Sequence, residues 1–156
     1  MIRITENFIT DLITKVKTSE RQRGNYNFHK QASDTLQRML NVMEPGTYVQ
    51  PHKHENPDKR EAFIILKGKV AVVEFSDDGK ITDHIILDHN KGNYGVEIAP
   101  RKWHTLICME TETVLYEVKD GPYNPEDDKQ FAKWAPAEGS GDTIKYNKDI
   151  LARIKG

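Results

Sequence analysis

Two histidines and a glutamate in one short stretch constrain the fold of this chain more than any other feature. His52 and His54 stand two residues apart in the segment Gly46–Gly68, GTYVQPHKHENPDKREAFIILKG. Side chains two residues apart on a β-strand project to the same face, so both imidazoles can bind one ion. The polar turn NPDK leads into a strand that begins at Glu61, and a hairpin here would bring its carboxylate back beside the histidines.

A third histidine completes the predicted metal site. His104 stands at the start of the apolar strand in PRKWHTLICM. Three imidazoles and one carboxylate are a common ligand set for a divalent transition metal, and the predicted ligands are His52, His54, Glu61 and His104. This set accepts iron, manganese, nickel, cobalt or zinc, so the sequence predicts one metal ion without choosing its element.

Three further residues of ligand type are expected to lie outside this site. His84 and His89 have no partner at a paired ligand spacing, and we expect both on the surface. Cys108 lies in an apolar strand and is predicted to be a small core residue.

Helices are expected at both ends of the chain. Residues 1–19 place apolar side chains at the 3.6-residue period of a helix with Thr5 as its cap, and these side chains are Ile4, Phe8, Leu12 and Val16, with Ile9 and Ile13 beside them. Residues 121–156 are rich in turns, and we expect short helices at Glu126–Lys133 and Lys148–Ile154.

Residues 20–120 are predicted to form a β-barrel. Short β-branched segments alternate with turn signals, and DDGK between KVAVVEFS and ITDHIILD indicates a hairpin. Many short strands with few helices between them are typical of an antiparallel barrel or sandwich. A chain of 156 residues suits one domain, so we expect a single domain, dominated by β-structure, over residues 1–156.

The metal motifs resemble those of the cupin superfamily. The first cupin motif has a glycine, five residues, HxH, a short gap, glutamate, six residues and a glycine, and the matching residues are Gly46, His52, His54, Glu61 and Gly68. The gap between the second histidine and the glutamate is longer than usual. The second motif has proline, glycine and then histidine; Pro100 and His104 match it, and Arg101 or Lys102 replaces the glycine.

A closer resemblance extends beyond the metal motifs. The segments RQRGNYNFH, LQRMLNVMEPGTYVQPHKH and EVKDGPYNPEDDKQFAKWAPAEG are similar to those of WbuC-type cupin-fold metalloproteins, over roughly residues 5–139. The resemblance implies a double-stranded β-helix, or jelly-roll barrel, that binds a metal. It also implies an association with surface-polysaccharide gene sets.

A row of polar side chains precedes the metal motifs. Five residues alternate with apolar or neutral ones in RQRGNYNFH, namely Arg21, Arg23, Asn25, Asn27 and His29. The commoner reading is the solvated face of an edge strand. The alternative is substrate binding, since guanidinium groups suit a phosphate or carboxylate and asparagines suit sugar hydroxyls.

Two more residues are candidates for substrate binding. Arg38 contributes if its face of the strand LQRMLNVME points into the barrel, and the alternation there leaves either face possible. Trp103, next to His104, either stacks on a sugar ring or forms part of the pocket wall.

Composition narrows the class of partner. The chain has 23 Lys and Arg against 24 Asp and Glu, which argues against a general nucleic-acid binder or a polybasic membrane anchor. One cysteine, no signal-peptide pattern and no apolar run of ~18 residues lead us to expect a cytoplasmic protein with no membrane span. We expect a homodimer, because the N-terminal helix and long tail can cover a sheet face or edge.

Two classes of function fit this sequence. In the first, a metal with open coordination positions supports isomerisation, epimerisation or oxidation of a small anionic or sugar-type substrate, such as a sugar nucleotide or sugar acid. In the second, the protein is a metal-dependent module that binds or senses a small molecule without catalysis.

Overall fold

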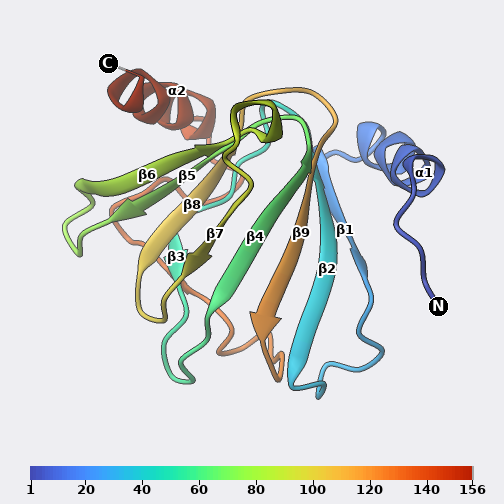
Figure 1. The fold of residues 1–156 in the computed structure, drawn as a ribbon. Helices are drawn as coiled ribbons and strands as arrows, with labels where there is room; N and C mark the ends of the chain where they lie inside the picture. The colour runs from blue at the N-terminus through green and yellow to red at the C-terminus, as the bar shows by residue number, and fades with distance from the viewer. Residues whose placement is uncertain (156) are drawn as a thin grey trace.

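Two five-stranded antiparallel sheets pack face to face, with one helix on the outer side of each (Figure 1). The computed structural model describes residues 1–155. Sheet A contains, in spatial order, β1 (Arg23–Asn27), β2 (Leu36–Met43), β9 (Thr113–Asp120), β4 (Glu61–Lys67) and β7 (Gly95–Ile98). Sheet B contains β10 (Gln130–Phe131), β3 (His52–Lys53), β8 (Trp103–Cys108), β5 (Val70–Phe75) and β6 (Ile81–Leu87). This architecture confirms the predicted cupin-type fold, with a short 3₁₀ turn (His89–Lys91) before β7.

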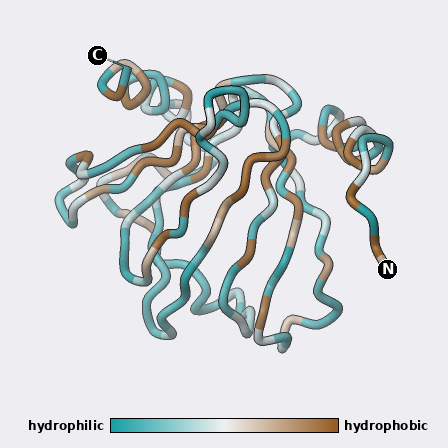
Figure 2. The backbone as a smooth tube through the Cα atoms, in the orientation of Figure 1, coloured by the Kyte–Doolittle hydropathy of each residue, from teal (hydrophilic) through white to brown (hydrophobic). Residues whose placement is uncertain are grey.

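The interior between the sheets changes character along the strands. On β4, Glu61, Phe63 and Ile65 point inward and are buried, while Ile64 and Leu66 point outward and are exposed. Beyond Glu61 the inner side chains of both sheets form a continuous apolar cluster. Figure 2 shows the same change, with hydrophilic loops at one end of the sandwich and hydrophobic segments toward the other. The polar end therefore holds the candidate site, and the apolar end holds the core.

The N-terminal helix, α1 (Glu6–Lys17), confirms the sequence prediction. The Thr5 side chain accepts a hydrogen bond from the Phe8 backbone N–H at 3.3 Å, which satisfies a free donor of the first turn. Buried apolar residues of α1 pack on the outer face of sheet A, and the cluster comprises Ile9, Ile13, Val16, Leu40, Val42 and Val114.

The C-terminal segment differs from the prediction. The helix expected at Lys148–Ile154 is part of a longer helix, α2 (Thr143–Ile154), which packs on the outer face of sheet B. The helix expected at Glu126–Lys133 was wrong, because these residues form turns and the short strand β10. Asp128 is fixed there by Lys59 and Lys119, each at 2.8 Å, and these tertiary contacts outweigh helix propensity.

The turn between β4 and β5 requires a glycine. Gly68 has a φ of +76°, and a Cβ atom there would lie 2.4 Å from Oγ1 of Thr113. Only glycine fits both the backbone conformation and the space. The hairpin predicted from DDGK is also present, as β5 pairs with β6.

Among residues 1–155, no helix is both long enough and apolar enough to cross a membrane.

Candidate metal centre

Four side chains from both sheets meet at the polar end of the sandwich. His52 on β3 pairs in register with His104 on β8, and Glu61 begins β4 in the opposite sheet. His54 follows directly after β3. One ligand atom from each residue lies within 4.8 Å of all the others, and each residue is at most 3 % exposed. The structure thus brings together all four predicted ligands.

The predicted hairpin between the histidines and Glu61 was wrong. β3 lies in sheet B and β4 in sheet A, so Glu61 reaches His52 across the interior of the sandwich. The two edges of β3 are already paired, one with β8 and the other with β10. Because no edge is left for β4, the chain crosses to the other sheet at the NPDK turn.

Backbone carbonyl groups fix the orientation of the three imidazole rings. Nδ1 of His52 lies 2.9 Å from the Gln50 carbonyl oxygen, and Nδ1 of His104 lies 2.9 Å from that of Lys102. Nδ1 of His54 contacts the carbonyl oxygen of Asp128. A carbonyl oxygen only accepts, so each Nδ1 carries the proton and each Nε2 presents a lone pair to the centre of the cluster.

The resulting arrangement suits a cation. Nε2 of His54 lies 2.9 Å from Oε1 of Glu61, and Nε2 of His104 lies 3.0 Å from Oε2. Among the described residues, the buried His54 Nε2 has no partner in hydrogen-bond geometry. Lone pairs on neutral rings that face a carboxylate at this distance repel each other unless a positive charge lies between them. The donor set therefore fits a divalent metal ion.

Burial sets the protonation state of the ligands. Burial lowers the pKa of His52 well below its ordinary value, with further lowering by the charge of Lys129, so the ring is neutral at pH 7. Burial opposes ionisation of Glu61, and positive charge on the His104 and His54 side of the carboxylate lowers its pKa well below the ordinary value; with neutral rings, a bound cation would supply that charge. A neutral imidazole and a carboxylate are the forms that bind metals.

A buried ion-pair network supports the cluster from behind. The Asp128 carboxylate contacts Nζ of Lys59 and Nζ of Lys119, each at 2.8 Å, and Lys119 also lies 3.7 Å from Glu61 Oε1. Burial opposes ionisation of Asp128, but the two lysines prevail and lower its pKa. The same residue holds the ring of His54 through its backbone carbonyl, so the network fixes one ligand directly.

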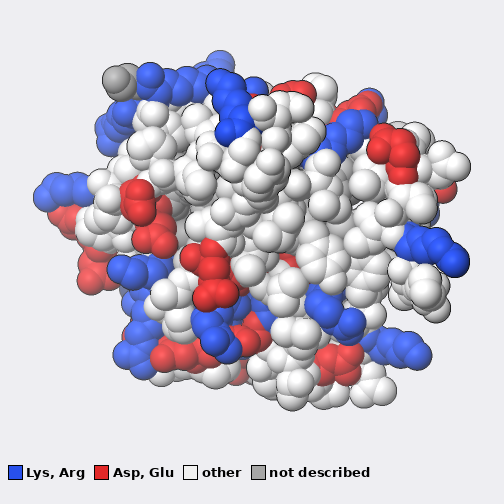
Figure 3. All heavy atoms as spheres, viewed as in Figure 1, with Lys and Arg blue, Asp and Glu red and all other residues white. Residues whose placement is uncertain are grey.

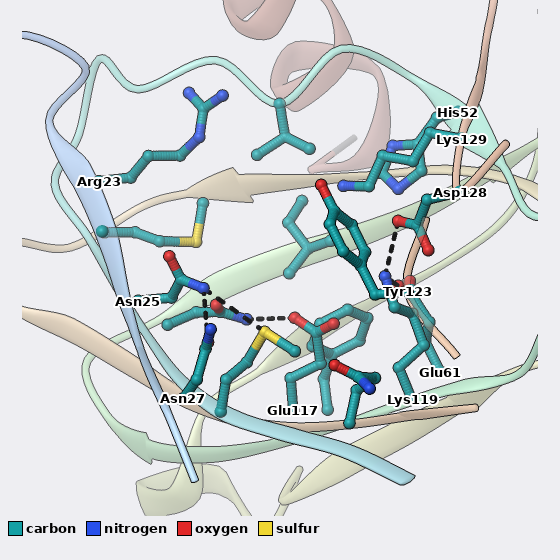
Figure 4. A pocket seen from close by; sticks show the side chains of 18 of the residues that line it. Arg23, Asn25, Asn27, His52, Glu61, Glu117, Lys119, Tyr123, Asp128 and Lys129 are labelled. Carbon is teal, nitrogen blue, oxygen red and sulfur yellow. Dashed lines mark hydrogen bonds and ion pairs between the residues drawn. The ribbon is translucent and has the colours of Figure 1, made fainter. Parts of the chain in front are cut away.

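A cavity of about 530 Å³ opens on one side of the cluster, where His52 and Glu61 form part of its wall (Figure 4). Many polar side chains line the rest of the cavity, and those shown there include Asn25, Asn27, Glu117, Lys119, Tyr123 and Lys129. Arg23 lies at the far end of this view from His52. A small molecule in the cavity thus has access to two of the four ligands.

Most of the predicted substrate-binding residues line this cavity. They are Arg21, Arg23, Asn25, Asn27 and His29. Arg38 does not, because it alternates along β2 with Gln37 and Met39, and those two face the cavity. Trp103 lies on the face of β8 opposite to His104 and donates a hydrogen bond to Asp77 at 2.8 Å, so it packs outside the site.

Both arginines of the polar row already have acceptors within the protein. Oε1 of Glu138 lies 2.9 Å from Nε of Arg21 and 2.8 Å from Nη2 of Arg23. Arg23 also donates to the backbone carbonyl of Tyr48 at 2.7 Å. These contacts tie the segment after β10 to the start of β1.

Several residues of the site were missed by the sequence analysis. Glu117 and Lys119 alternate with Tyr116 and Val118 on β9, and this polar face opposite an apolar one was a usable signal. Asp128 gave no such signal, because its role depends on contacts with residues far away in the sequence.

The residue that replaces the glycine of the second cupin motif has a glycine-like backbone conformation. Arg101 has a φ of 66°, in the left-handed region that favours glycine. Its backbone N–H donates to the carbonyl of His54 at 3.0 Å. Arg101 therefore occupies the place of the motif's glycine and holds the backbone of a ligand.

Comparison with protein families identifies the group to which this chain is related. Residues 4–87, more than half of the chain, match the family described as a domain of unknown function, DUF6016. The chain belongs to the DUF6016 family. A search of curated proteins found no relative of this DUF6016 protein.

Solved structures show the fold of this DUF6016 member to be cupin-like. CapF, a capsular polysaccharide assembling protein from Staphylococcus aureus, is 20 % identical with a TM-score of 0.60 over 73 % of this chain and 33 % of CapF. L-ribose isomerase from Cellulomonas parahominis is 16 % identical, with a TM-score of 0.56 over 72 % of this chain and 70 % of the isomerase. KdgF from Halomonas sp. is 12 % identical, with a TM-score of 0.53 over 69 % of this chain and 86 % of KdgF. The chain thus spans only about a third of the length of CapF.

Proposed function

We propose that this protein is a metal-dependent enzyme that isomerises or epimerises a small sugar-type or anionic substrate. One divalent transition metal would be held by His52, His54, Glu61 and His104. The observation that carries the proposal is the cavity of about 530 Å³ that opens on His52 and Glu61. A purely structural metal site needs no such access, whereas catalytic sites keep one side open to substrate.

The chemistry of such a site is divided between the ion and the protein. When bound, the metal supplies Lewis acidity toward a carbonyl or hydroxyl oxygen, and it can also support oxidation. Asn25, Asn27 and Asn41 offer amide donors and acceptors for hydroxyl groups along the cavity wall. The exposed amine of Lys129, which lies beside His52 in Figure 4, offers a positive charge to an anionic group at the mouth.

Sugar chemistry is favoured by two kinds of resemblance. The segments similar to WbuC-type proteins imply a link to surface polysaccharides, and CapF is a capsular polysaccharide assembling protein. L-ribose isomerase shares the fold and its structure holds L-psicose, a ketose. We infer a sugar, sugar acid or sugar nucleotide as the substrate of this chain.

A metal-dependent binding or sensing module is the second candidate. Its support is the contact of Glu138 with Arg21 and Arg23, because an anionic ligand at the arginines would release the segment that carries Glu138. Turnover of a bound ligand separates the two candidates.

Elemental analysis of the purified protein tests the metal site. We expect about one equivalent of a transition metal in the wild type and in His84→Ala, an exposed histidine away from the cluster. The double variant His52→Ala, His54→Ala should lose the metal and keep its β-sheet circular dichroism spectrum. Full metal occupancy in that variant would rule out the assignment.

A substrate screen tests the activity. Metal-loaded protein is incubated with aldoses, sugar acids and sugar nucleotides, with and without oxygen, and binding and conversion are followed by calorimetry and NMR. Conversion without oxygen supports isomerisation or epimerisation, and binding without conversion supports the sensing module.

A further inference from the structure

Among the described residues, four carboxyl groups line the cavity, and one of them lies outside the four-residue cluster and makes no ion pair. The four are Glu61, Glu117, Asp128 and Glu138. Glu61 belongs to the cluster, both oxygens of Asp128 contact lysines, and Glu138 contacts two arginines. Glu117 has no cationic partner within 4 Å among the described residues.

The geometry of Glu117 leaves one oxygen for a ligand. It lies on the inner face of β9 and is 7 % exposed. Among the described residues, Asn41 is its hydrogen-bond donor, through the side-chain amide to Oε2. Figure 4 shows this contact and the Glu117 carboxyl group within the cavity wall. A buried carboxyl group oriented on one side by an amide has its other oxygen available to the cavity.

Glu117 also lies close enough to the cluster to act on the same small molecule. In the register of β4 and β9, Lys119 lies opposite Glu61, and Glu117 lies opposite Phe63. Glu117 and Glu61 are therefore diagonal neighbours on the same face, roughly 7–8 Å apart at their backbones. Glu117, Glu61 and His52 also line the same cavity, so one small molecule can contact all three.

Lys119 and His29, two other titratable groups of the cavity, are less suited to accept a proton. Lys119 contacts Asp128 at 2.8 Å and, although burial opposes its charge, nearby carboxylates including Glu61 raise its pKa, so it stays protonated. The Nδ1 atom of His29 accepts the backbone N–H of Arg38 at 3.2 Å. In contrast, Glu117 has no cationic partner within 4 Å among the described residues, and burial raises its pKa above the ordinary value, which makes its carboxylate a better proton acceptor.

We propose that Glu117 is the catalytic base and acid of an aldose–ketose isomerisation in this cavity, with Asn41 as its positioning residue. This inference rests on the proposed function and names its reaction class. The C2–H bond of an open-chain aldose breaks, and its proton moves to the Glu117 carboxylate. Its electron pair forms the C1–C2 double bond while the π pair of the C1 carbonyl moves to O1, which gives an enediolate. The proton on O2 passes to O1, the C2 carbonyl forms, and Glu117 returns its proton to C1. Atoms and electrons balance without an oxidant or reductant.

Deuterium exchange in D₂O tests the role of Glu117. Metal-loaded protein is incubated with D-ribose, D-mannose, D-glucose 6-phosphate and D-glucuronate, and deuterium on carbon is measured by NMR. The wild type should exchange at least one of these sugars. Glu117→Gln should slow the exchange by about 10²–10⁴-fold, the usual contribution of a general base, while metal content and sugar affinity stay at the wild-type level.

Two further variants separate chemistry from folding. Glu97→Gln, at an exposed glutamate on β7, should exchange at the wild-type rate. Glu117→Asp keeps the carboxyl group and should recover part of the rate, and its pH profile should differ from that of the wild type because the carboxyl group lies in a new position.

The outcomes distinguish this inference from the proposed function. Exchange in Glu117→Gln at the wild-type rate overturns the role of Glu117 and leaves the metal enzyme intact. A wild-type protein that binds metal and a sugar but exchanges no deuterium overturns the isomerisation. A wild-type protein that binds no metal contradicts the proposed function, and this inference fails with it.

Discussion

The backbone carbonyl of Asp128 accepts the Nδ1 proton of His54, across 74 positions of sequence. The side chain of the same aspartate binds two buried lysines, Lys59 and Lys119. One residue of the C-terminal segment therefore holds both a metal ligand and the charges behind it. The segment that follows β9 is part of the candidate metal centre as well as a cover for the sandwich.

Removal of the Asp128 carboxylate should weaken both the fold and the metal site. Asp128→Asn leaves two buried ammonium groups without their shared partner, and such a loss costs about 3–5 kcal/mol of unfolding free energy. Looser support of the His54 ring should lower metal affinity by roughly 10- to 100-fold. Denaturant melts and chelator competition measure the two effects. The neighbour Asp127 is exposed, and Asp127→Asn should change neither quantity by much.

The four ligands were predictable because their signal is local. The HxH pair and Glu61 follow from strand alternation and motif spacing, and His104 begins a strand that the sequence marks clearly. The path between them was less predictable. Sequence periodicity marks a strand but does not say which edge it pairs with, so the assignment of β3 and β4 to one hairpin failed.

The C-terminal segment shows a second limit of local patterns. Residues Glu126–Lys133 contain good helix formers, but the ion pairs of Asp128 fix them in turns and in β10. These partners, Lys59 and Lys119, are remote in sequence, so no window around Asp128 contains the cause. In contrast, α1 has a local cap and a local apolar stripe, and its prediction was confirmed.

Substitution of Gly68 by alanine should destabilise the protein more than the same change at Gly92. Both glycines have φ near +80°, so both substitutions carry the cost of a left-handed backbone, about 1–2 kcal/mol. Only at Gly68 does the new Cβ meet Thr113, at 2.4 Å, whereas nothing lies within 4 Å at Gly92. The difference between the two unfolding free energies measures the steric term. Equal losses would contradict this reading of the turn.

An ion pair that ties α1 to sheet A should give a pH dependence of stability. Glu112 contacts Lys17 at 2.6 Å and Lys67 at 2.8 Å, and these contacts lower its pKa from 4.5 to about 2. Because the pKa of Glu112 is lowered in the folded state, its carboxylate contributes to the free energy of unfolding. This contribution is fully present above pH 4.5 and is lost as the pH falls through about 2.

The variant Glu112→Gln isolates this contribution. Its unfolding midpoint in urea should lie below that of the wild type at pH 6, and the difference should shrink to a small fraction of that value near pH 2. Because the Glu112 side chain is only partly buried, added salt should also reduce the difference. A difference that persists at pH 2 would show that the substitution acts through packing or backbone strain.

We expect the protein to form a homodimer through the outer face of sheet A. Ile64 and Leu66 are exposed there on β4, 44 % and 36 % respectively, and Figure 3 shows a broad area without charged side chains over the middle of this face. A second copy can cover such a surface. Light scattering at micromolar concentration should give the dimer mass, and Ile64→Lys should give a monomer. Ile144→Lys, at an exposed residue of α2, serves as the matched control.

The arginine pair at the far end of the cavity should bind the charged end of an anionic substrate in competition with Glu138. Glu138 lies 2.9 Å from Arg21 and 2.8 Å from Arg23, so a phosphate or carboxylate at the pair must displace it. Arg21→Ala removes a charge-assisted contact and should weaken the binding of an anionic sugar by about 1.5–3 kcal/mol, roughly 10- to 100-fold. Arg23→Ala should act in the same direction and also destabilise the fold, because Arg23 donates to the Tyr48 carbonyl.

Glu138→Gln provides the opposite test of the same idea. Loss of the competing carboxylate should tighten the binding of D-glucuronate or D-glucose 6-phosphate, while binding of uncharged D-mannose stays constant because it does not need the arginines. Calorimetry measures these affinities, and elemental analysis should find the same metal content in every variant. If the arginine and glutamate variants all bind an anionic sugar as the wild type does, the pair serves only to anchor the C-terminal segment. Arg21 and Arg23 then have no part in substrate binding, while the candidate metal centre formed by His52, His54, Glu61 and His104 keeps the support of its own geometry.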